Sequence, residues 1–513
     1  MMKTKTCTFL IAAIISLCNF ISTATAQDVP GLRDTLHSKI LNETRDIRVI
    51  LPDNYKPGSG VKYDVLYVLD AEDDARKMLN IERLAESYHF IPPMIIVNIL
   101  TIYYNDRDRD FTPSHIDTLP TSGGAKNFLS FLKDEVVPFI DKKYPTNGDN
   151  TLYGHSLGGL FTFYTLLHEP QLFRSYIITD PSLWWDNGYM NKMLDDKLNT
   201  TALAGKTIYI GSRDGDGMVQ MRTDVMDRIL KAKAPAGLHW QSIHYPNETH
   251  FSLIYKTAYD GLKYTYSGYN PGSMEFHPMD GIVLKDKPFN LVFYNPLPAE
   301  PAIRYTTDGT LPTAVSTKMA VKNTISGSTT VNIKSFCFRE KYDTVLGVRY
   351  KTGDVLPSIA KPKNIQPGGL HYNYYEGTWD KLPDFGKLKP SLSGIAGKNF
   401  RVANNIAKFP NPNNFALLLE GYVEIKEDGY YTFLLNSDDG SRLYLGDKLL
   451  IDYDGIHGRW DAKSYMVPLQ RGFYPIRLEY FQNKYDLFLE IKYIPRGSTN
   501  PILIPFEQQY SGN

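Results

Sequence analysis

Cysteine is scarce in this sequence of 513 residues, which contains three. Two of them, Cys7 and Cys18, lie in an N-terminal segment that has the features of a removable leader. Cys337 would then be the single cysteine of the mature chain, which excludes an intrachain disulfide. Its strand-like surroundings indicate an inert thiol in a β core.

Net charge is also absent. The 56 Lys and Arg residues balance the 56 Asp and Glu residues, so the formal net charge is zero. Neither nucleic acid nor an anionic membrane surface is therefore expected as a partner. Hydrophobic residues make up 42% of the chain, which predicts mainly globular structure, and the length suits three domains.

A long hydrophobic run is missing as well. The apolar stretch Phe9–Ile21 is too short for a membrane span. It follows Lys3 and Lys5 and precedes an A-x-A cleavage site, so we predict a signal peptide over residues 1–26. The residues before Cys18 suit a lipoprotein poorly. We therefore expect a soluble secreted or periplasmic product with no membrane span in the mature chain.

One stretch, Gly154-His155-Ser156-Leu157-Gly158-Gly159, lies between a short buried strand and an unbroken helix. Strand, G-x-S-x-G and helix in this order are typical of the nucleophile elbow of α/β-hydrolases. We expect a Cβ at either Gly154 or Gly158 to clash in so tight a turn. The Leu157 N–H, at the helix N-terminus, would be offered to a developing oxyanion. We predict that Ser156 is a nucleophile; the alternative is a glycine-rich turn without one.

Strands and helices alternate between Arg45 and Tyr266. This alternation predicts an α/β fold with a mostly parallel sheet covered on both faces, and a ligand site at the carboxyl ends of the strands. The expected strands are 45–51, 62–69, 93–99, 150–153, 175–179, 207–210 and 239–245, and the expected helices are 127–142, 160–167, 220–233 and 252–262.

The partners of the nucleophile should follow it in the order acid, then histidine. Asp214 stands on a loop directly after strand 207–210, and we favour it as the acid over Asp216. An ordinary Asp-Gly turn is the alternative for both residues. His250 follows the last strand and precedes a helix, which suits the base, whereas His244 lies inside the strand and suits a structural role.

Four stretches make residues 45–267 similar to the esterase D-like family of α/β-hydrolases, which includes siderophore, feruloyl and acetylxylan esterases. This resemblance implies a second oxyanion N–H near Asp70 or Ala71. It implies further that Arg107 or Arg109 and the pair Trp184-Trp185 line the substrate mouth, although the tryptophans could equally pack under a loop. Some siderophore esterases of this family act through a Ser–His dyad, so the resemblance leaves open whether an acid such as Asp214 takes part. The four stretches are Asp64–Asp70, Arg109–Pro113, Gly154–Gly159 and Asp180–Asp186.

After Ser267 the helical period ends and short alternating strands begin. Residues 268–355 resemble the chitobiase/hexosaminidase C-terminal-like domain, an Ig-like β-sandwich, through the Ala302–Thr313 stretch. A Pro- and Lys-rich linker is expected over 356–367.

Residues 368–513 resemble a PA14 domain, an all-β barrel or sandwich, through Gly429–Leu445 and Gly472–Phe481. PA14 domains are often glycan-binding. In some of them two adjacent aspartates hold calcium, which Asp438 and Asp439 could do here; a tight turn without metal is the alternative.

Together these features predict a secreted serine carboxylic-ester hydrolase over residues 27–267, with no cofactor for catalysis and two β domains after it. We expect the substrate to be an acetyl or feruloyl ester on a carbohydrate, because a glycan-binding PA14 module would tether the enzyme to a polymer. A catecholate trilactone siderophore is the alternative substrate. A catalytically dead glycan-binding protein is the alternative of another class.

Overall fold

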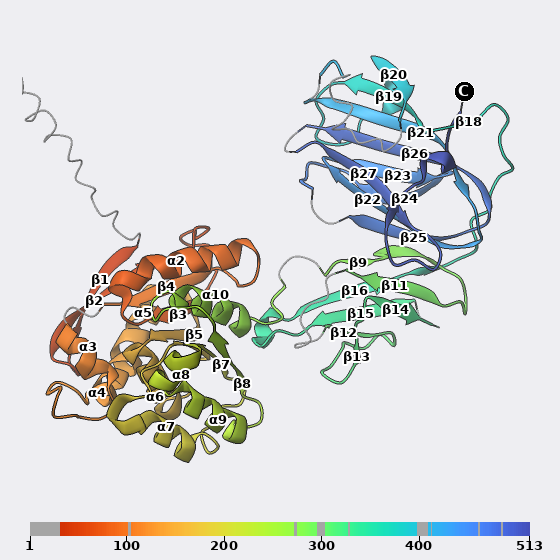
Figure 1. The fold of residues 1–513 in the computed structure, drawn as a ribbon. Coiled ribbons are helices and arrows are strands. Elements are labelled where there is room, and N and C mark those ends of the chain that lie inside the picture. Colours follow the sequence, from red (N-terminus) through yellow and green to blue (C-terminus); the bar gives the residue numbers. More distant parts are fainter. Residues whose placement is uncertain are drawn as a thin grey trace, which may run out of the picture. The chain divides into compact units, whose positions relative to one another are not determined.

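The computed structural model describes residues 31–512 except 101–103, 271–273, 295–302, 327–328, 398–408, 412, 460–461 and 484–485. The signal peptide predicted over residues 1–26 lies outside this part. The chain divides into two compact units, the first ending at Tyr266 and the second beginning at Ser267 (Figure 1). Among the helices that the structure describes, none combines the length and apolarity needed to cross a membrane.

The first unit is built on an eight-stranded sheet with the strand order β1-β2-β4-β3-β5-β6-β7-β8. Neighbouring strands from β4 to β8 along this order are parallel, whereas β1 and β2 pair antiparallel at one edge. The predicted α/β architecture is therefore present, but the sheet is mixed. Its strands are β1 (Leu32–Ser38), β2 (Glu43–Ile50), β3 (Tyr63–Val68), β4 (Met94–Ile99), β5 (Thr146–His155), β6 (Ser175–Thr179), β7 (Thr207–Arg213) and β8 (His239–Tyr245).

Helices lie on both faces of this sheet (Figure 1). Helices α2 and α10 contact each other, and α6 contacts α3, α4 and α7 in a separate group. The expected helix 127–142 is divided by the π-helical segment η1. The helices are α2 (Ala71–Ser87), α3 (Tyr104–Phe111), α4 (Ala125–Phe131), η1 (Leu132–Val136), α5 (Val137–Lys143), α6 (Leu157–His168), α7 (Trp185–Lys197), α8 (Gly215–Met221), α9 (Thr223–Lys233) and α10 (Leu253–Thr265).

Helix α6 and the central strands form the core of the first unit. Every residue of α6 from Leu157 to Leu167 is buried, because its side chains are apolar on all sides. The strands β3, β4 and β6 are buried along their whole length, as expected for sheets covered on both faces. Strand β8 is half-buried at every position, as befits an edge.

The regular secondary structure in the described part of the second unit consists of β-strands and short 3₁₀ turns. Its first part has two small sheets, β14-β11-β9 and β13-β12-β15-β16, around one apolar core that includes Leu291, Val331 and Ile333. The strands are β9 (Phe276–His277), β10 (Asp280–Val283), β11 (Phe289–Phe293), β12 (Ile303–Thr306), β13 (Thr317–Lys318), β14 (Lys322–Ile325), β15 (Thr330–Ser335), β16 (Thr344–Arg349) and β17 (Lys351–Thr352).

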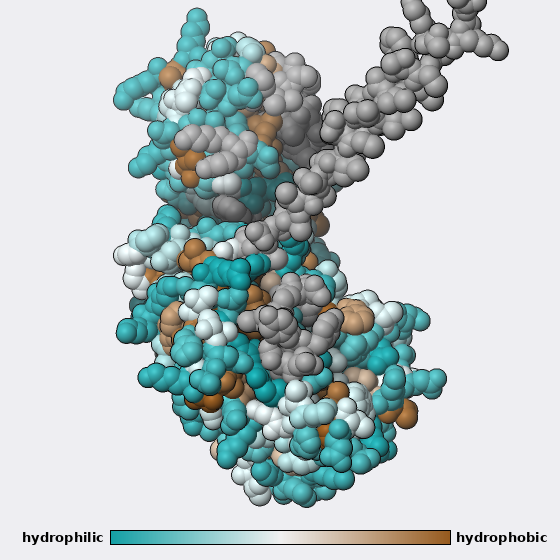
Figure 2. Space-filling view, turned by 90° about the vertical axis from the view of Figure 1, so that its left-hand side faces the viewer, coloured by the Kyte–Doolittle hydropathy of each residue, from teal (hydrophilic) through white to brown (hydrophobic). Residues whose placement is uncertain are grey.

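The rest of the second unit packs two larger sheets around an aromatic and aliphatic core that includes Tyr374, Phe415 and Tyr480. On the face in Figure 2, hydrophobic residues are scattered in small groups among hydrophilic ones. The strands are β18 (Gln366–Pro367), β19 (His371–Glu376), β20 (Leu392–Ile395), β21 (Phe415–Ile425), β22 (Gly429–Asp438), β23 (Ser441–Leu445), β24 (Lys448–Tyr453), β25 (Lys463–Leu469), β26 (Gly472–Gln482), β27 (Phe488–Ile494), β28 (Ile502–Leu503) and β29 (Gln509–Ser511).

The two β parts of the second unit share a sheet. Strand β10 pairs in parallel with β25, so one six-stranded sheet runs β17-β10-β25-β22-β27-β28. The segment 356–367 also bonds to the larger part: the Leu356 N–H donates to Pro468 O at 2.9 Å, and Ile359 exchanges backbone hydrogen bonds with Phe473. These contacts join the two parts through backbone hydrogen bonds.

Candidate active site

Ser156 occupies a strained turn between β5 and α6. Its backbone has φ 60° and ψ −116°, a conformation that L-residues with a side chain rarely adopt. The turn is held by the strand beside it, because the Ser156 N–H donates to Thr179 O and the Ser182 N–H donates to Ser156 O, both at 3.0 Å. This is the geometry predicted for a nucleophile elbow.

The two glycines of the elbow have different roles. A Cβ at Gly154 would lie 2.2 Å from Gly158 O and 2.4 Å from Thr162 Oγ1, which is impossible without rearrangement. A Cβ at Gly158 would meet nothing closer than Asp70 Oδ2 at 3.6 Å, an ordinary contact. The expectation that Gly158 is required on steric grounds is therefore wrong, whereas that for Gly154 holds.

His250 lies on the loop between β8 and α10, and a carboxylate holds its ring. His250 Nδ1 donates to Asp180 Oδ2 at 2.7 Å. Asp180 is fully buried directly after β6, at the carboxyl edge of the sheet where Ser156 also lies. Burial by itself would raise the pKa of Asp180, but the hydrogen bonds from His250 and Arg213 outweigh it and hold the pKa below its ordinary value.

The structure places Asp180, and not Asp214, against the histidine. Asp214 and Asp216 are exposed at the start of α8. The assignment failed because β7 does not end at Ile210 but continues to Arg213, whose side chain points to Asp180. The Asp214-Gly215 pair that follows caps and begins helix α8. Its role is therefore structural, as in the alternative of an ordinary Asp-Gly turn.

Arg213 binds the same carboxylate oxygen as His250. Its Nε donates to Asp180 Oδ2 at 2.6 Å, and its backbone N–H approaches Asp180 Oδ1 at 3.4 Å. Asp180 therefore has a cationic partner in addition to the imidazole, and both share one oxygen.

His155, inside the elbow, supports the loop that carries His250. The His155 ring lies 4.3 Å from the His250 ring between centroids, and its Nε2 donates to the His250 carbonyl oxygen at 2.8 Å. Burial, followed by the repulsion of His250, lowers the pKa of His155 to about 3. His155 is thus a neutral donor at physiological pH and fixes the backbone of His250.

Asp70 stands beside the elbow, where the second oxyanion donor was predicted. It has a left-handed backbone with φ 55° and precedes α2, which begins at Ala71. Arg107 Nε donates to Asp70 Oδ2 at 2.8 Å, and Arg107 Nη2 approaches His155 O at 3.5 Å. Leu157 is the first residue of α6, where helical N–H groups have no partner within the helix. That these backbone groups bind an oxyanion stays a prediction.

The four residues predicted for the substrate mouth separate into two pairs. Arg109 bonds to Glu43 and Asp110 in a structural ion cluster, and Trp185 is fully buried with its Nε1 on Ser114 Oγ at 3.1 Å. Arg107 stays beside the elbow. Trp184 is 44% exposed two residues after Ser182, whose hydroxyl lies 3.2 Å from Ser156 Oγ.

A second exposed aromatic was not predicted. Phe251, next to His250, is 69% exposed and lies 5.8 Å from the His155 ring between centroids. Asp180 and Ser182 were not predicted as site residues either. The sequence does contain a signal for them, since Asp180 directly follows the buried strand 175–179 and Ser182 comes two residues later.

A second group of serine, histidine and aspartate is formed by Ser212 on β7, His244 on β8 and Asp227 on α9. His244, predicted to be structural, has Nδ1 2.6 Å from Ser212 Oγ and Nε2 2.5 Å from Asp227 Oδ2. The hydrogen bond to Asp227 raises the pKa of His244 above its ordinary value.

The Asp438-Asp439 pair of the second unit uses most of its oxygens internally. Asp439 accepts backbone N–H groups from His457 and Asn483 at 3.3 and 2.7 Å, and Asp438 Oδ2 accepts from Asp486 at 3.2 Å. Burial and the neighbouring Asp439 raise the pKa of Asp438 to about 6. No group of three or more His, Cys, Asp or Glu arranged for a metal is found among the described residues, so calcium stays a prediction.

Residues 38–241 match the family model described as Esterase ("Putative esterase"), and residues 397–498 match the PA14 domain model. The "Ferri-bacillibactin esterase BesA" of Bacillus subtilis (strain 168) is 26% identical over 256 residues, which cover 45% of this chain and 88% of that protein.

Two further similarities were found. The "Siderophore triacetylfusarinine C esterase" of Aspergillus fumigatus is 36% identical over 113 residues, 20% of this chain, and the match spans 39% of that protein. A solved IroE-like serine hydrolase from Shewanella oneidensis is 29% identical, covers 47% of this chain and 82% of its own, and has a TM-score of 0.44.

Proposed function

Since residues 38–241 are a domain of this esterase family, we propose that the chain is a serine ester hydrolase acting through Ser156, His250 and Asp180. The observation that carries the proposal is the hydrogen bond from His250 Nδ1 to buried Asp180, formed beside the strained turn of Ser156. A buried carboxylate on Nδ1 leaves Nε2 of the same ring to accept the serine proton.

The reaction would proceed by acyl transfer. His250 takes the proton of Ser156 as its Oγ attacks the ester carbonyl, and then gives that proton to the departing alcohol. Asp180 orients the ring and stabilises the imidazolium. The N–H of Leu157, with a second from the Asp70–Ala71 turn, would bind the oxyanion. Water activated by His250 then releases the acid and regenerates Ser156.

The substrate we favour is a siderophore ester that carries aromatic groups. Its support is twofold: the two curated relatives described above are named as a ferri-bacillibactin esterase and a siderophore triacetylfusarinine C esterase, and Trp184 and Phe251 present exposed aromatic surface near the elbow. Aromatic rings at a site mouth stack on planar groups of a ligand. The signal peptide predicted over residues 1–26 would place this activity outside the cytoplasm.

A carbohydrate-borne ester is the second candidate, and the PA14 match over 397–498 favours it. A glycan-binding module would raise the local concentration of ester groups on a polymer. A feruloyl group is also aromatic, so exposed rings alone do not separate the two substrates.

The test is a comparison of kcat/KM on a catecholate trilactone with that on feruloylated and acetylated xylo-oligosaccharides, in the full chain. We expect at least a ~10-fold preference for the trilactone and loss of all activities in Ser156→Ala. A preference for the oligosaccharides would overturn the siderophore assignment, and activity that survives in Ser156→Ala would overturn the serine mechanism.

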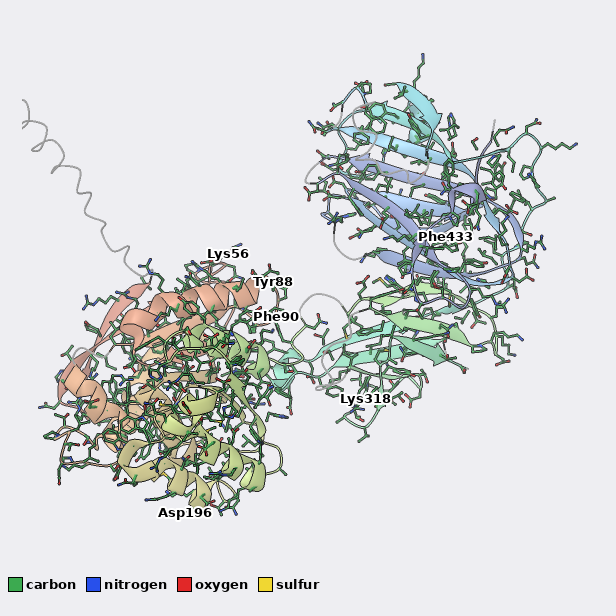
Figure 3. All side chains as sticks on the ribbon, in the orientation of Figure 1. Lys56, Tyr88, Phe90, Asp196, Lys318 and Phe433 are labelled. Atoms are coloured by element: carbon green, nitrogen blue, oxygen red, sulfur yellow. The ribbon has the colours of Figure 1, made fainter. Side chains whose placement is uncertain are left out.

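Matched aromatic variants sharpen this test. Trp184→Ala and Phe251→Ala should raise KM for the trilactone several-fold. Tyr88→Ala serves as the control, because Tyr88 (labelled in Figure 3) is 66% exposed but follows the C-terminal end of α2, whereas Asp70 at the other end of this helix adjoins the elbow. Equal changes of KM in the three variants would show that Trp184 and Phe251 do not contact the substrate.

A further inference from the structure

A cleft of about 760 Å³ lies within the second unit, where its two β parts meet. One wall comes from the turn and strand at 284–292, and the other from the ends of β22, β25 and β27. The volume is in the range of sites that hold a small organic ligand. None of the groups discussed for ester hydrolysis belongs to it.

Hydrogen bonds between the two parts hold the walls of this cleft in place. Within the cleft, the Leu284 N–H donates to Tyr430 Oη at 2.8 Å. Outside it, Tyr294 Oη donates to Thr499 O at 2.6 Å, and the pairing of β10 with β25 continues the sheet behind it. The cleft is therefore preformed, so a ligand would not have to order its walls.

The lining combines apolar and polar side chains, with apolar residues on the floor and two cations at the rim. Phe289, Val292 and Met466 are almost fully buried beneath the cleft. Lys287 and Arg496 line it and are exposed. A ligand that fills the cleft would thus meet apolar surface along its body and positive charge at its edge.

Two acidic residues lie near these cations. Asp428 lines the cleft, but its Oδ1 accepts the Arg471 N–H at 2.6 Å, and its carbonyl accepts from Arg496 Nη1 at 3.3 Å. Glu427 Oε2 is 3.9 Å from Arg496 Nη1, and both side chains are mostly exposed. An exposed pair at this distance is weak, so it leaves Arg496 available for an anionic ligand.

We propose that this cleft binds planar aromatic anions of the catecholate class. The ring would pack on the apolar floor beside Tyr430, and the phenolate or carboxylate oxygens would pair with Lys287 and Arg496. The choice of this class rests on the proposed siderophore-ester function, and it gives the second unit the task of holding the released acid or the uncleaved ester.

The cleft is separate from the Asp438-Asp439 pair. It is at the Gly429 end of β22, and Asp438 ends the same ten-residue strand, about 30 Å away at ~3.3 Å per residue. Phe433, labelled in Figure 3, lies midway along this strand. Substitutions at the two ends can therefore be compared without shared contacts.

The probe for the test is N-(2,3-dihydroxybenzoyl)serine, which has no ester to cleave, titrated by calorimetry into the full chain. We expect binding that weakens at least 5-fold in Lys287→Ala and in Arg496→Gln, and falls further in the double variant. Lys318→Ala and Arg349→Gln are matched controls, because both residues are exposed on strands outside the cleft (Figure 3 labels Lys318). These controls and Asp438→Asn should bind as the unchanged chain does.

Three outcomes would overturn the proposal. The first is that an esterase substrate displaces all of the bound catechol probe, and the second is that the control variants lose as much affinity for the probe as the cleft variants do. The third is that the full chain binds trigalacturonate more tightly than the catechol probe. Hydrolysis of p-nitrophenyl acetate is measured in parallel, and the double variant should hydrolyse it as the unchanged chain does, which keeps the two proposals distinguishable. Hydrolysis by the unchanged chain without any binding at the cleft overturns the cleft assignment alone. Cleft binding that persists in a chain without hydrolysis overturns the esterase proposal and leaves the cleft supported.

Discussion

Two groups of serine, histidine and aspartate lie near the carboxyl ends of the strands of one sheet, and we propose nucleophilic chemistry for the group of Ser156 alone. The histidines are equally accessible, with 25% of the His250 side chain and 24% of the His244 side chain exposed. The rings differ in orientation: His250 turns Nδ1 to its aspartate, whereas His244 turns Nε2 to its aspartate and Nδ1 to Ser212.

The serines differ more than the histidines. Ser156 stands in a turn with positive φ at the start of a helix, is half-buried, and has helical N–H groups beside it. Ser212 is fully buried within β7 and pairs with His244 across to β8. The types of the residues and their proximity are thus insufficient to identify a catalytic serine. The backbone that carries the serine decides whether a substrate can reach its hydroxyl.

The largest contrast is expected between the two serines. Ser156→Ala should lower kcat for p-nitrophenyl acetate about 10³-fold or more, because the nucleophile is lost. Ser212→Ala should change kcat less than about 3-fold, since it removes a buried hydroxyl outside the reaction. Comparable losses in the two variants would contradict the difference drawn between the groups.

A similar contrast applies to the aspartates. Asp180→Asn should lower kcat about 10²- to 10⁴-fold, because an amide cannot hold the histidine tautomer or stabilise the imidazolium. Asp214→Asn, an exposed position, should retain activity within about 3-fold. Thermal melts of both variants control for folding. A ranking in the opposite order would restore Asp214 as the acid.

Arg213 should set the acid side of the pH profile. Its guanidinium shares Asp180 Oδ2 with His250 and opposes a positive charge on that imidazole. Arg213→Gln should therefore move the acid limb of kcat/KM to higher pH, by about 0.5–1 unit. Arg213→Lys should keep the limb in place, as should Arg228→Gln, because the Arg228 side chain is exposed on α9. A lower kcat with an unmoved limb would give Arg213 a purely structural role.

The smallest effect is expected from the second group, and it concerns stability. The pKa of His244 is raised by Asp227, so the pair stabilises the folded unit fully below the unfolded value near 6.5 and loses this contribution as pH rises through the folded value. Asp227→Asn should cost roughly 1 kcal/mol at pH 6 and less at pH 9. The readout is the temperature at which esterase activity is lost. A cost that is independent of pH would refute this linkage.

The sequence was most informative where local pattern and local structure coincide. The elbow around Ser156 and the position of His250 after the last strand both depend on strand–turn–helix order, which neighbouring residues encode. The alternation from Arg45 to Tyr266 likewise indicated the α/β fold. The antiparallel edge strand β1, with its alternating exposed residues, precedes that pattern and was not predicted.

The predictions of site residues were wrong where the end of a strand or the face of a helix determines which side chain reaches the site. Asp180 and Asp214 both follow buried strands in the correct chain order, and three more residues of β7 were enough to move Asp214 away. The sequence does not distinguish Arg107 from Arg109, because nothing in it predicts α3. Two residues apart on a helix, they point to different faces, one toward the elbow and one into the ion cluster with Glu43.

Long-range pairing was the other limit. Nothing near Asp280 indicates that β10 pairs with β25, more than 180 residues later, because such pairing depends on backbone groups and not on a local motif. The cleft of the second unit is a consequence of that pairing, so it too was not predictable from sequence.

Covalent labelling tests the central claim most directly. The full chain is treated with diisopropyl fluorophosphate at neutral pH, and the adduct is counted by intact mass and located by peptide mass spectrometry. The account predicts one adduct per chain, on Ser156, with complete loss of esterase activity and no labelling of Ser212. An unlabelled Ser156, or an adduct on Ser212 that abolishes activity, would contradict it.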